Sequence, residues 1–216
     1  MNNESTQVLV FFAVLVIIFI VLTVVTVKKR SNRLEEIKNF ANQNGWEFQK
    51  DPTVFTNYLI KTNGWSVEQR APSRSNPSSN SKREQVTNYF FTDLKGNNET
   101  LIMSPDIPIL GMLFSNQVVL GEFLDKKELE KTDIKLQIIE NNFKVEVSDK
   151  QWAEKMINDE FKKELKNSTA KDLRIIAIGI VGNQLIIRTP RIDKIENLQT
   201  LIEFGQKLKN VVQKSI

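Results

Sequence analysis

A run of twenty residues, from Val8 to Val27, constrains the fold of this chain more than any other feature, because only Thr23 and Thr26 in it are not apolar. At about 1.5 Å of rise per residue, a helix of this length matches the roughly 30 Å hydrocarbon core of a bilayer. Val and Ile, which are abundant here, favour strands in water, but a lone strand in hydrocarbon would leave its backbone N–H and C=O groups without partners. The sequence therefore predicts a transmembrane helix over residues 8–27.

The flanking residues predict how this helix is placed. No Lys or Arg precedes the run and no small-x-small cleavage site follows it, which is typical of an uncleaved anchor and not of a signal peptide. Lys28, Lys29, Arg30 and Arg33 follow the run, and the positive-inside rule then places the C-terminal part in the cytoplasm. We expect a single-pass protein of the cell membrane with residues 1–7 as a short outer tail. We also expect these four basic side chains to contact headgroups of the anionic inner leaflet.

The chain after the span, residues 28–216, has room for one domain with its own core. It carries all 30 Lys and Arg and all but one of the 26 Asp and Glu. Beyond the membrane-flanking cluster the two signs are interspersed, which is typical of a soluble surface and not of a nucleic-acid footprint. The expected partners are therefore membrane lipid and a protein whose identity is left open, as is the oligomeric state, with no nucleic acid.

The chain contains no Cys and no His. This excludes disulfides, thiolate catalysis, zinc sites built from Cys and His, and acid–base catalysis by His. Glycine-rich phosphate-binding loops and the G-x-S-x-G serine motif are absent as well, and acid pairs such as Glu160 and Glu164 are typical of solvated helix faces. We expect no cofactor, no metal site and no catalytic residue, so the sequence favours a protein without enzymatic activity.

Residues 28–44 predict a basic, amphipathic helix next to the membrane, because Leu34, Ile37, Phe40 and Ala41 recur at helical spacing. Such a helix would either lie along the lipid headgroups or cap the domain that follows.

The domain itself is expected to span residues 45–216. Two Asn-Gly-Trp triplets, at 44–46 and 63–65, are too short to indicate a repeat. Asp51-Pro52 is typical of a helix start, and the brief helix that it predicts would carry Phe55, Tyr58 and Leu59.

Proline, serine and asparagine at residues 71–83 predict a mobile loop. Strand patterns follow over residues 85–93, 99–103 and 117–123. Between the last two lies the most apolar stretch after the span, residues 107–114, in which a Pro and a Gly argue against a regular element. It would be either a buried crossover or an exposed docking surface. In the second case the surface would be formed by Ile107, Ile109, Leu110, Met112 and Phe114.

The second half of the chain has clearer patterns. Residues 134–147 predict a hairpin, and Ser148 with Gln151 predicts a capping box that opens one helix. The apolar face of that helix would consist of Trp152, Ala153, Met156, Ile157, Phe161 and Leu165. Gly182-Asn183 predicts the turn of a second hairpin, whose first strand is nearly all apolar and therefore central. A final helix from about residue 193 would close over the sheet with a stripe made of Ile195, Leu198, Ile202, Gly205, Leu208 and Val212.

One segment, covering roughly residues 134–212, resembles a known family. It contains Phe143-x-Val145-x-x-x-Asp149-x-x-x-Ala153, then Phe161 and Leu165, then the hairpin around Gly182-Asn183. This pattern is similar to a bacterial family of uncharacterised single-pass membrane-anchored proteins with a cytoplasmic α+β domain. The resemblance implies a shared fold and carries over no catalytic or binding residue.

Together these patterns predict the α+β class: one transmembrane helix and one antiparallel-sheet domain closed by a C-terminal helix, with a pleckstrin-homology-like half-barrel as the alternative. The function that follows is a non-enzymatic interaction or scaffold module on the cytoplasmic face of the membrane. Two alternatives remain open. One is recognition of lipid headgroups by the folded domain, and the other is a membrane-tethered hydrolase that uses carboxylates and a metal.

Overall fold

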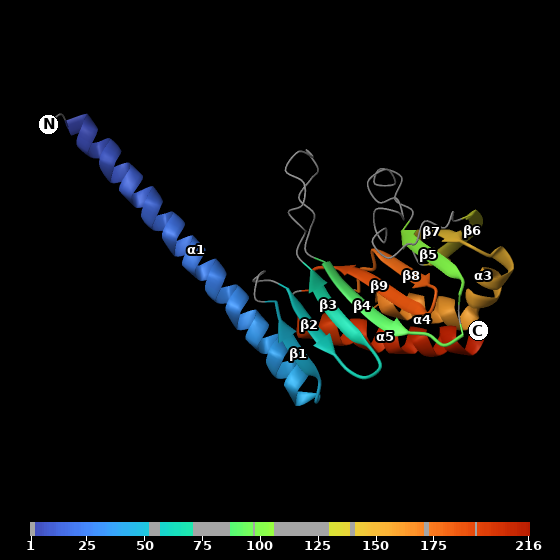
Figure 1. Cartoon of the computed structure of the whole chain (residues 1–216). Helices are drawn as coiled ribbons and strands as arrows, with labels where there is room; N and C mark the ends of the chain where they lie inside the picture. Colours follow the sequence, from blue (N-terminus) through green and yellow to red (C-terminus); the bar gives the residue numbers. More distant parts are fainter. Residues whose placement is uncertain are drawn as a thin grey trace.

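The computed structural model describes residues 3–51, 57–70, 87–96, 98–105, 130–138, 141–170, 173–192 and 194–216. Within these ranges the chain forms one long N-terminal helix and one antiparallel sheet whose face is covered by helices (Figure 1). The predicted α+β class, with a C-terminal helix packed on the sheet, is confirmed.

Helix α1 (Asn3–Gln43) is continuous over 41 residues. It joins the predicted transmembrane run and the predicted juxtamembrane helix into one rod, since no Pro or Gly occurs inside it to break the hydrogen-bond ladder. Two residues after the helix ends at Gln43, Gly45 has a φ of 71° and donates its N–H to the carbonyl of Asn42 at 3.0 Å. A glycine in the left-handed region is a common helix stop, and it turns the chain back into the sheet.

In the described ranges, nine strands form one sheet in the order β1-β2-β3-β4-β9-β8-β5-β7-β6. Their bounds are β1 (Glu47–Lys50), β2 (Tyr58–Lys61), β3 (Ser66–Arg70), β4 (Thr87–Asp93), β5 (Thr100–Pro105), β6 (Glu130–Ile138), β7 (Asn141–Val147), β8 (Ala177–Val181) and β9 (Gln184–Pro190). All pairs are antiparallel and the described sheet is open, so the alternative half-barrel is not formed. The hairpin of β8 and β9 turns at Gly182 and lies in the middle of the sheet, which confirms the predicted central position.

The brief helix predicted after Asp51 is wrong for its last two members, because Tyr58 and Leu59 begin strand β2. Tyr58 and Ile60 are buried on one face while Leu59 and Lys61 lie more open, and this alternation spans too few residues to stand out in the sequence. The rest of that segment lies outside the described residues. The predicted loop at 71–83, the run at 107–114 and the strand at 117–123 also lie outside them.

The single helix predicted after Ser148 is wrong, since the chain forms two helices, α3 (Lys150–Met156) and α4 (Asp159–Ala170). The break lies at Asn158, whose Oδ1 accepts a hydrogen bond from the N–H of Phe161 at 2.9 Å and so caps α4. The predicted cap is displaced by one residue as well. Asp149 Oδ1 accepts from the N–H of Trp152 at 2.8 Å, whereas the Ser148 hydroxyl accepts from the N–H of Thr100 at 2.9 Å.

We expect Asp149→Ala to lower the free energy of unfolding by about 1 kcal/mol, because the first turn of α3 would lose its side-chain cap. Asp149→Asn retains an oxygen acceptor and should stay within a few tenths of a kcal/mol of the native chain. Urea unfolding of both variants, followed by tryptophan fluorescence, checks this. Equal stability of the Ala and Asn variants would contradict the capping role.

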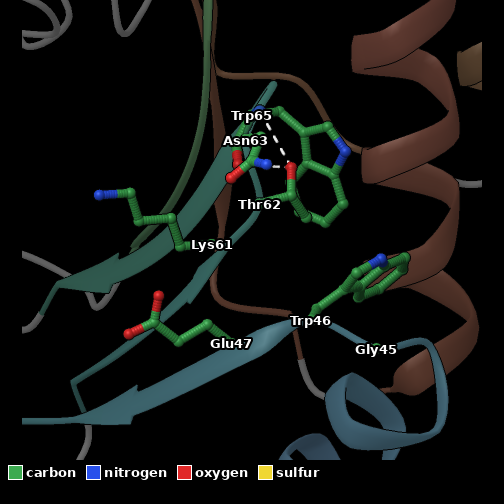
Figure 2. A pocket seen from close by; sticks show the side chains of 7 residues that line it. All are labelled: Gly45, Trp46, Glu47, Lys61, Thr62, Asn63 and Trp65. Carbon is green, nitrogen blue, oxygen red and sulfur yellow. Dashed lines mark hydrogen bonds between the residues drawn. The ribbon is translucent and has the colours of Figure 1, made fainter.

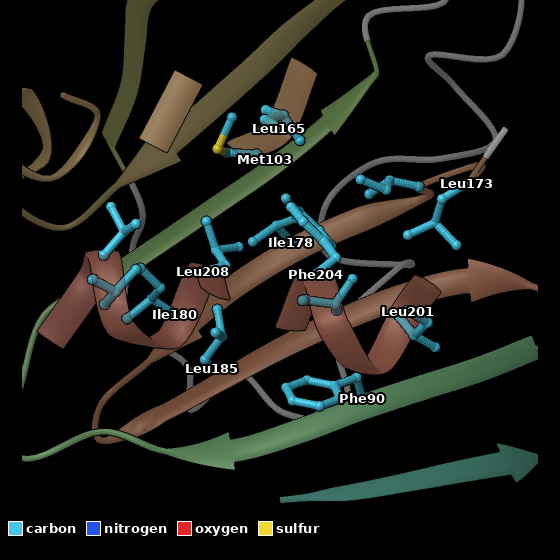
Figure 3. Close-up of a cluster of buried hydrophobic side chains, with 14 of the residues drawn as sticks. Phe90, Met103, Leu165, Leu173, Ile178, Ile180, Leu185, Leu201, Phe204 and Leu208 are labelled. Atoms are coloured by element: carbon cyan, nitrogen blue, oxygen red, sulfur yellow. The ribbon is translucent and has the colours of Figure 1, made fainter. Parts of the chain in front are cut away.

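One face of the sheet carries the main core. Helix α5 (Ile195–Ser215) lies across this face, and α4 packs beside it (Figure 1). Figure 3 shows Leu201, Phe204 and Leu208 of α5 in one cluster with Phe90, Ile178, Ile180 and Leu185 of the central strands. The predicted stripe of α5 is buried apart from Ile195, which is partly buried against the same core. Closure of the sheet by this helix is confirmed.

The opposite face carries a smaller cluster that includes Tyr89 of β4 and Ile186 of β9, with Phe91 packed against it. Two guanidinium groups lie over these rings: Arg70 is 5.4 Å from the centroid of Tyr89 and 5.9 Å from that of Phe91, and Arg188 is 5.4 Å from that of Tyr89. Cation–π contacts of this kind fix both arginines on the surface of the sheet.

Candidate functional site

The apolar part of α1 is uncovered. The large apolar side chains from Phe11 to Val27 are exposed, Phe19 at 72% of its surface. Thr23 and Thr26 donate their hydroxyls to the carbonyls of Phe19 at 2.8 Å and Leu22 at 2.7 Å, so their polar groups are satisfied within the helix. The described residues contain one helix, α1, that is both long enough and apolar enough to cross a membrane. It supplies a candidate membrane anchor.

The structure divides the four basic residues that follow this stretch. Lys28 and Lys29 are exposed, and the side chain of Arg30 lies outside the described set. Arg33 is half-buried and turns toward the domain, where its Nη2 donates a long hydrogen bond of 3.5 Å to Oε1 of Gln69 in β3. Arg33 therefore helps to dock α1 on the sheet, while Lys28 and Lys29 face solvent.

The last turns of α1 belong to the core of the domain. Ile37 is 3% exposed and Ala41 is 0% exposed, and both belong to the main buried cluster. Leu34 and Phe40 pack against that cluster from its rim. Of the two placements open to this segment, the structure shows the one in which it packs on the domain.

A chain of aromatic rings continues this junction into the sheet. Phe40 of α1 meets Trp46 edge to face at 5.4 Å between centroids, and Trp46 meets Trp65 edge to face at 4.9 Å. Trp65 then stacks on Phe90 of β4 at 6.0 Å. Aromatic pairs at these separations stabilise beyond the area that they bury. The two Asn-Gly-Trp triplets of the sequence thus meet in space, although they form no repeat.

A row of buried polar residues lies at the other end of the same strands. Tyr58, Gln69, Asn88 and Thr189 are direct register partners across β2, β3, β4 and β9. Asn88 is 0% exposed; its Nδ2 donates to the Tyr58 hydroxyl at 2.8 Å, and its Oδ1 accepts from the N–H of Ile192 at 3.0 Å. These bonds offset the cost of burying polar groups and fix where β9 leaves the sheet toward α5.

The contact of Arg33 with Gln69 and the contact of Trp46 with Trp65 set the direction of α1 relative to the sheet. Arg33 lies beside Gln69, near the end of β3, whereas Trp46 lies beside Trp65, just before its beginning. Helix α1 therefore runs antiparallel to β3, and its apolar part continues beyond the end of the sheet at which β3 stops (Figure 1). Arg33 follows Val27 by six residues, which is about 9 Å along a helix. That end of the sheet is the one near the apolar stretch.

A hollow of about 490 Å³ lies at the opposite end. Figure 2 shows the indole rings of Trp46 and Trp65 on one side of it and the side chains of Glu47 and Lys61, which are register partners, on the other. Thr62 Oγ1 accepts from the N–H groups of Gly64 and Trp65, both at 3.2 Å, and so closes the turn beside it. Its lining has one carboxylate and one ammonium, and the described residues contain no group of three or more Asp or Glu side chains that could hold a metal ion.

The predicted docking surface of Ile107, Ile109, Leu110, Met112 and Phe114 lies outside the described residues and stays a prediction. Sequence reasoning missed the aromatic chain and the polar row. Their members carry no motif. Their signals are the tryptophans after two Asn-Gly turns, and Gln69 and Asn88, which lie two positions from the buried Val67 and Phe90 in their strands.

No protein-family model matches the sequence, and no curated protein matches it. Among solved structures, the fold is similar to the crystal structure of the mycobacterial trehalose monomycolate transport factor A, TtfA, with a TM-score of 0.52 and 11% sequence identity. The likeness covers 84% of this chain and 94% of that chain. At this identity it supports the fold alone, and the resemblance of residues 134–212 to a family of membrane-anchored proteins stays a prediction.

Proposed function

We propose that this chain is a single-pass membrane protein whose domain works as a non-enzymatic interaction module at the cytoplasmic surface. One observation carries the proposal. The large apolar side chains of α1 from Phe11 to Val27 are exposed, whereas Ile37 and Ala41 further along the same helix belong to the domain core. An exposed apolar helix of this length is stable in lipid and not in water. Because the two parts are one helix, the anchor holds the domain in a fixed direction.

The basic residues support the cytoplasmic orientation. Lys28 and Lys29 are exposed directly after the apolar stretch, and the tail before it has no basic side chain. Each Lys or Arg beside an anionic leaflet contributes roughly 1 kcal/mol of attraction. Lys28, Lys29 and Arg30 are the proposed headgroup contacts at the cytoplasmic end of the span. Arg33 is proposed to contact headgroups as well as Gln69.

The proposal of binding over catalysis is in keeping with the role of the fold neighbour, because TtfA is a transport factor. Among the described residues, the hollow at Trp46 and Trp65 is lined mainly by rings and a turn, which suits the binding role that we propose.

Single-cysteine labelling tests the topology, because the chain has no cysteine of its own. We expect Ser5→Cys to react with a membrane-impermeant maleimide in intact cells, and Asn63→Cys to react only after the inner membrane is opened. Both variants should stay in the membrane pellet after carbonate washing. Extraction by carbonate, or labelling of Asn63→Cys in intact cells, would overturn the proposal.

A further inference from the structure

We propose that the domain has a second membrane contact, made by the end of the sheet beside Arg33, and that its ligands are anionic lipid headgroups. This inference rests on the proposed anchoring of α1. It goes further by assigning lipid binding to residues of the folded domain that lie far from the span in sequence.

Basic side chains gather at the end of the sheet beside Arg33. This end, here called the basic end, carries Lys50, Arg70, Arg188, Arg191 and Lys194 among the described residues, against Asp51, Glu68 and Glu196. The opposite end carries Lys61, Lys95 and Lys209, whose Nζ donates to the carbonyl of Gly64 at 3.4 Å, against Glu47 and Asp93. The end toward which the apolar part of α1 points therefore has a surplus of positive charge.

The geometry brings the basic end within reach of the bilayer surface. Arg33, which contacts the end of β3, is about 9 Å along the helix from Val27. The electrostatic field of a charged leaflet falls off over a Debye length of about 8–10 Å at physiological salt. The opposite end, where α1 stops at Gln43, is about 24 Å from Val27 and lies beyond that range.

The junction makes this contact depend on the tilt of α1. Ile37, Ala41 and the aromatic chain fix the domain to the helix, so the basic end cannot swing toward the lipid by itself. Transmembrane helices tilt by about 20° on average, and interfacial anchors set the direction of the tilt. Contacts between the basic end and anionic lipid would therefore tilt the whole molecule toward that side.

Two local features keep cationic groups at the surface of the basic end. Lys194 is the N-cap of α5, is exposed and makes no side-chain cap bond, although a cation is disfavoured at the positive end of a helix. Arg70 and Arg188 are held over the ring of Tyr89 at 5.4 Å each. Glu68 pairs with Arg70 at 2.8 Å and offsets one charge, and the surplus at this end remains positive.

The test uses the full chain in lipid nanodiscs that carry acceptor dyes on their headgroups. A donor dye is attached at Asn197→Cys, in the first turn of α5 at the basic end, or at Asn63→Cys, in the turn at the opposite end. We expect stronger energy transfer from position 197 than from position 63. We also expect the transfer from 197 to rise when neutral lipid is partly replaced by anionic lipid.

Charge reversal with a matched control separates the basic end from net charge. Lys50→Glu with Lys194→Glu should abolish the rise with anionic lipid, since each basic residue near such a surface contributes about a fivefold factor. Lys61→Glu with Lys95→Glu changes the net charge equally at the opposite end and should leave the rise intact. Raising the salt to about 1 M shortens the Debye length to about 3 Å and should also abolish it, which tests the native sequence without any mutation.

The outcomes are distinct. Failure of the chain to enter nanodiscs would overturn the anchoring itself and this inference with it. Normal insertion with stronger transfer from position 63, or a rise that survives high salt, would overturn the lipid contact and leave the anchor standing. A rise lost equally in both charge-reversal pairs would show an effect of net charge and would also overturn the assignment to the basic end.

Discussion

Replacing Gly205 by alanine is expected to lower the free energy of unfolding by about 2 kcal/mol, although alanine is the better helix former. A Cβ at this position would overlap Cε1 of Phe90 and lie 2.5 Å from its Cζ. The ring cannot simply move away, because Phe90 is 0% exposed and stacked on Trp65. Overpacking of this kind costs about 1–3 kcal/mol or more, which exceeds the roughly 1 kcal/mol that alanine gains in helix propensity.

Urea unfolding of the full chain in detergent, followed by the fluorescence of its tryptophans, measures this effect. The matched variant is Gly205→Ala in a Phe90→Leu background, where the smaller side chain leaves room for the new methyl group. There the alanine should be neutral or slightly stabilising, which gives a coupling energy of about 2 kcal/mol in a double-mutant cycle. A stabilising Gly205→Ala in the native background would show that α5 does not approach β4 as closely as described.

The second large effect is expected where the last turns of α1 pack on the domain. Ile37→Ala should cost about 3 kcal/mol, because Ile37 is 3% exposed and its removal leaves a cavity between α1 and the domain. Lys38→Ala is the neighbouring control. Its side chain is 46% exposed and pairs at 3.2 Å with Glu35, itself 60% exposed, so its loss should cost about 0.5 kcal/mol or less.

The functional consequence of Ile37→Ala is measured separately from stability. Spin labels at Ser31→Cys on α1 and Asn63→Cys on the sheet should give a narrow distance distribution in the native background, because α1 and the domain form one body. The distribution should broaden in Ile37→Ala and stay narrow in Lys38→Ala. Equal widths in all three chains would mean that the domain is not held by the core contacts of α1.

Local sequence patterns predicted most helices and strands of this fold. The apolar run at 8–27, the Gly182-Asn183 turn and the stripe of α5 each depend on neighbours in sequence, so their periodicity indicates helix or hairpin directly. The sequence predicted a helix at Tyr58, but this residue lies in strand β2, which pairs with β1 on one side and β3 on the other. The sequence also predicted one helix where the cap at Asn158 separates two. Both errors come from contacts that a pattern of period 3.6 or 2 does not contain.

The candidate sites divide in the same way. An apolar stretch long enough to span a membrane and a basic cluster beside it are visible in the residue order, because both are continuous segments of the sequence. The basic end of the sheet is not visible there. Lys50, Arg70, Arg188 and Lys194 come from distant parts of the chain, and strand pairing with the antiparallel docking of α1 is what places them at one end. The residue order thus specifies that the chain has an apolar helix followed by an α+β domain. Long-range packing at Ile37, Trp46 and Gln69 specifies which end of the sheet lies nearest the apolar part of that helix, since only contacts between distant residues can orient one element against another.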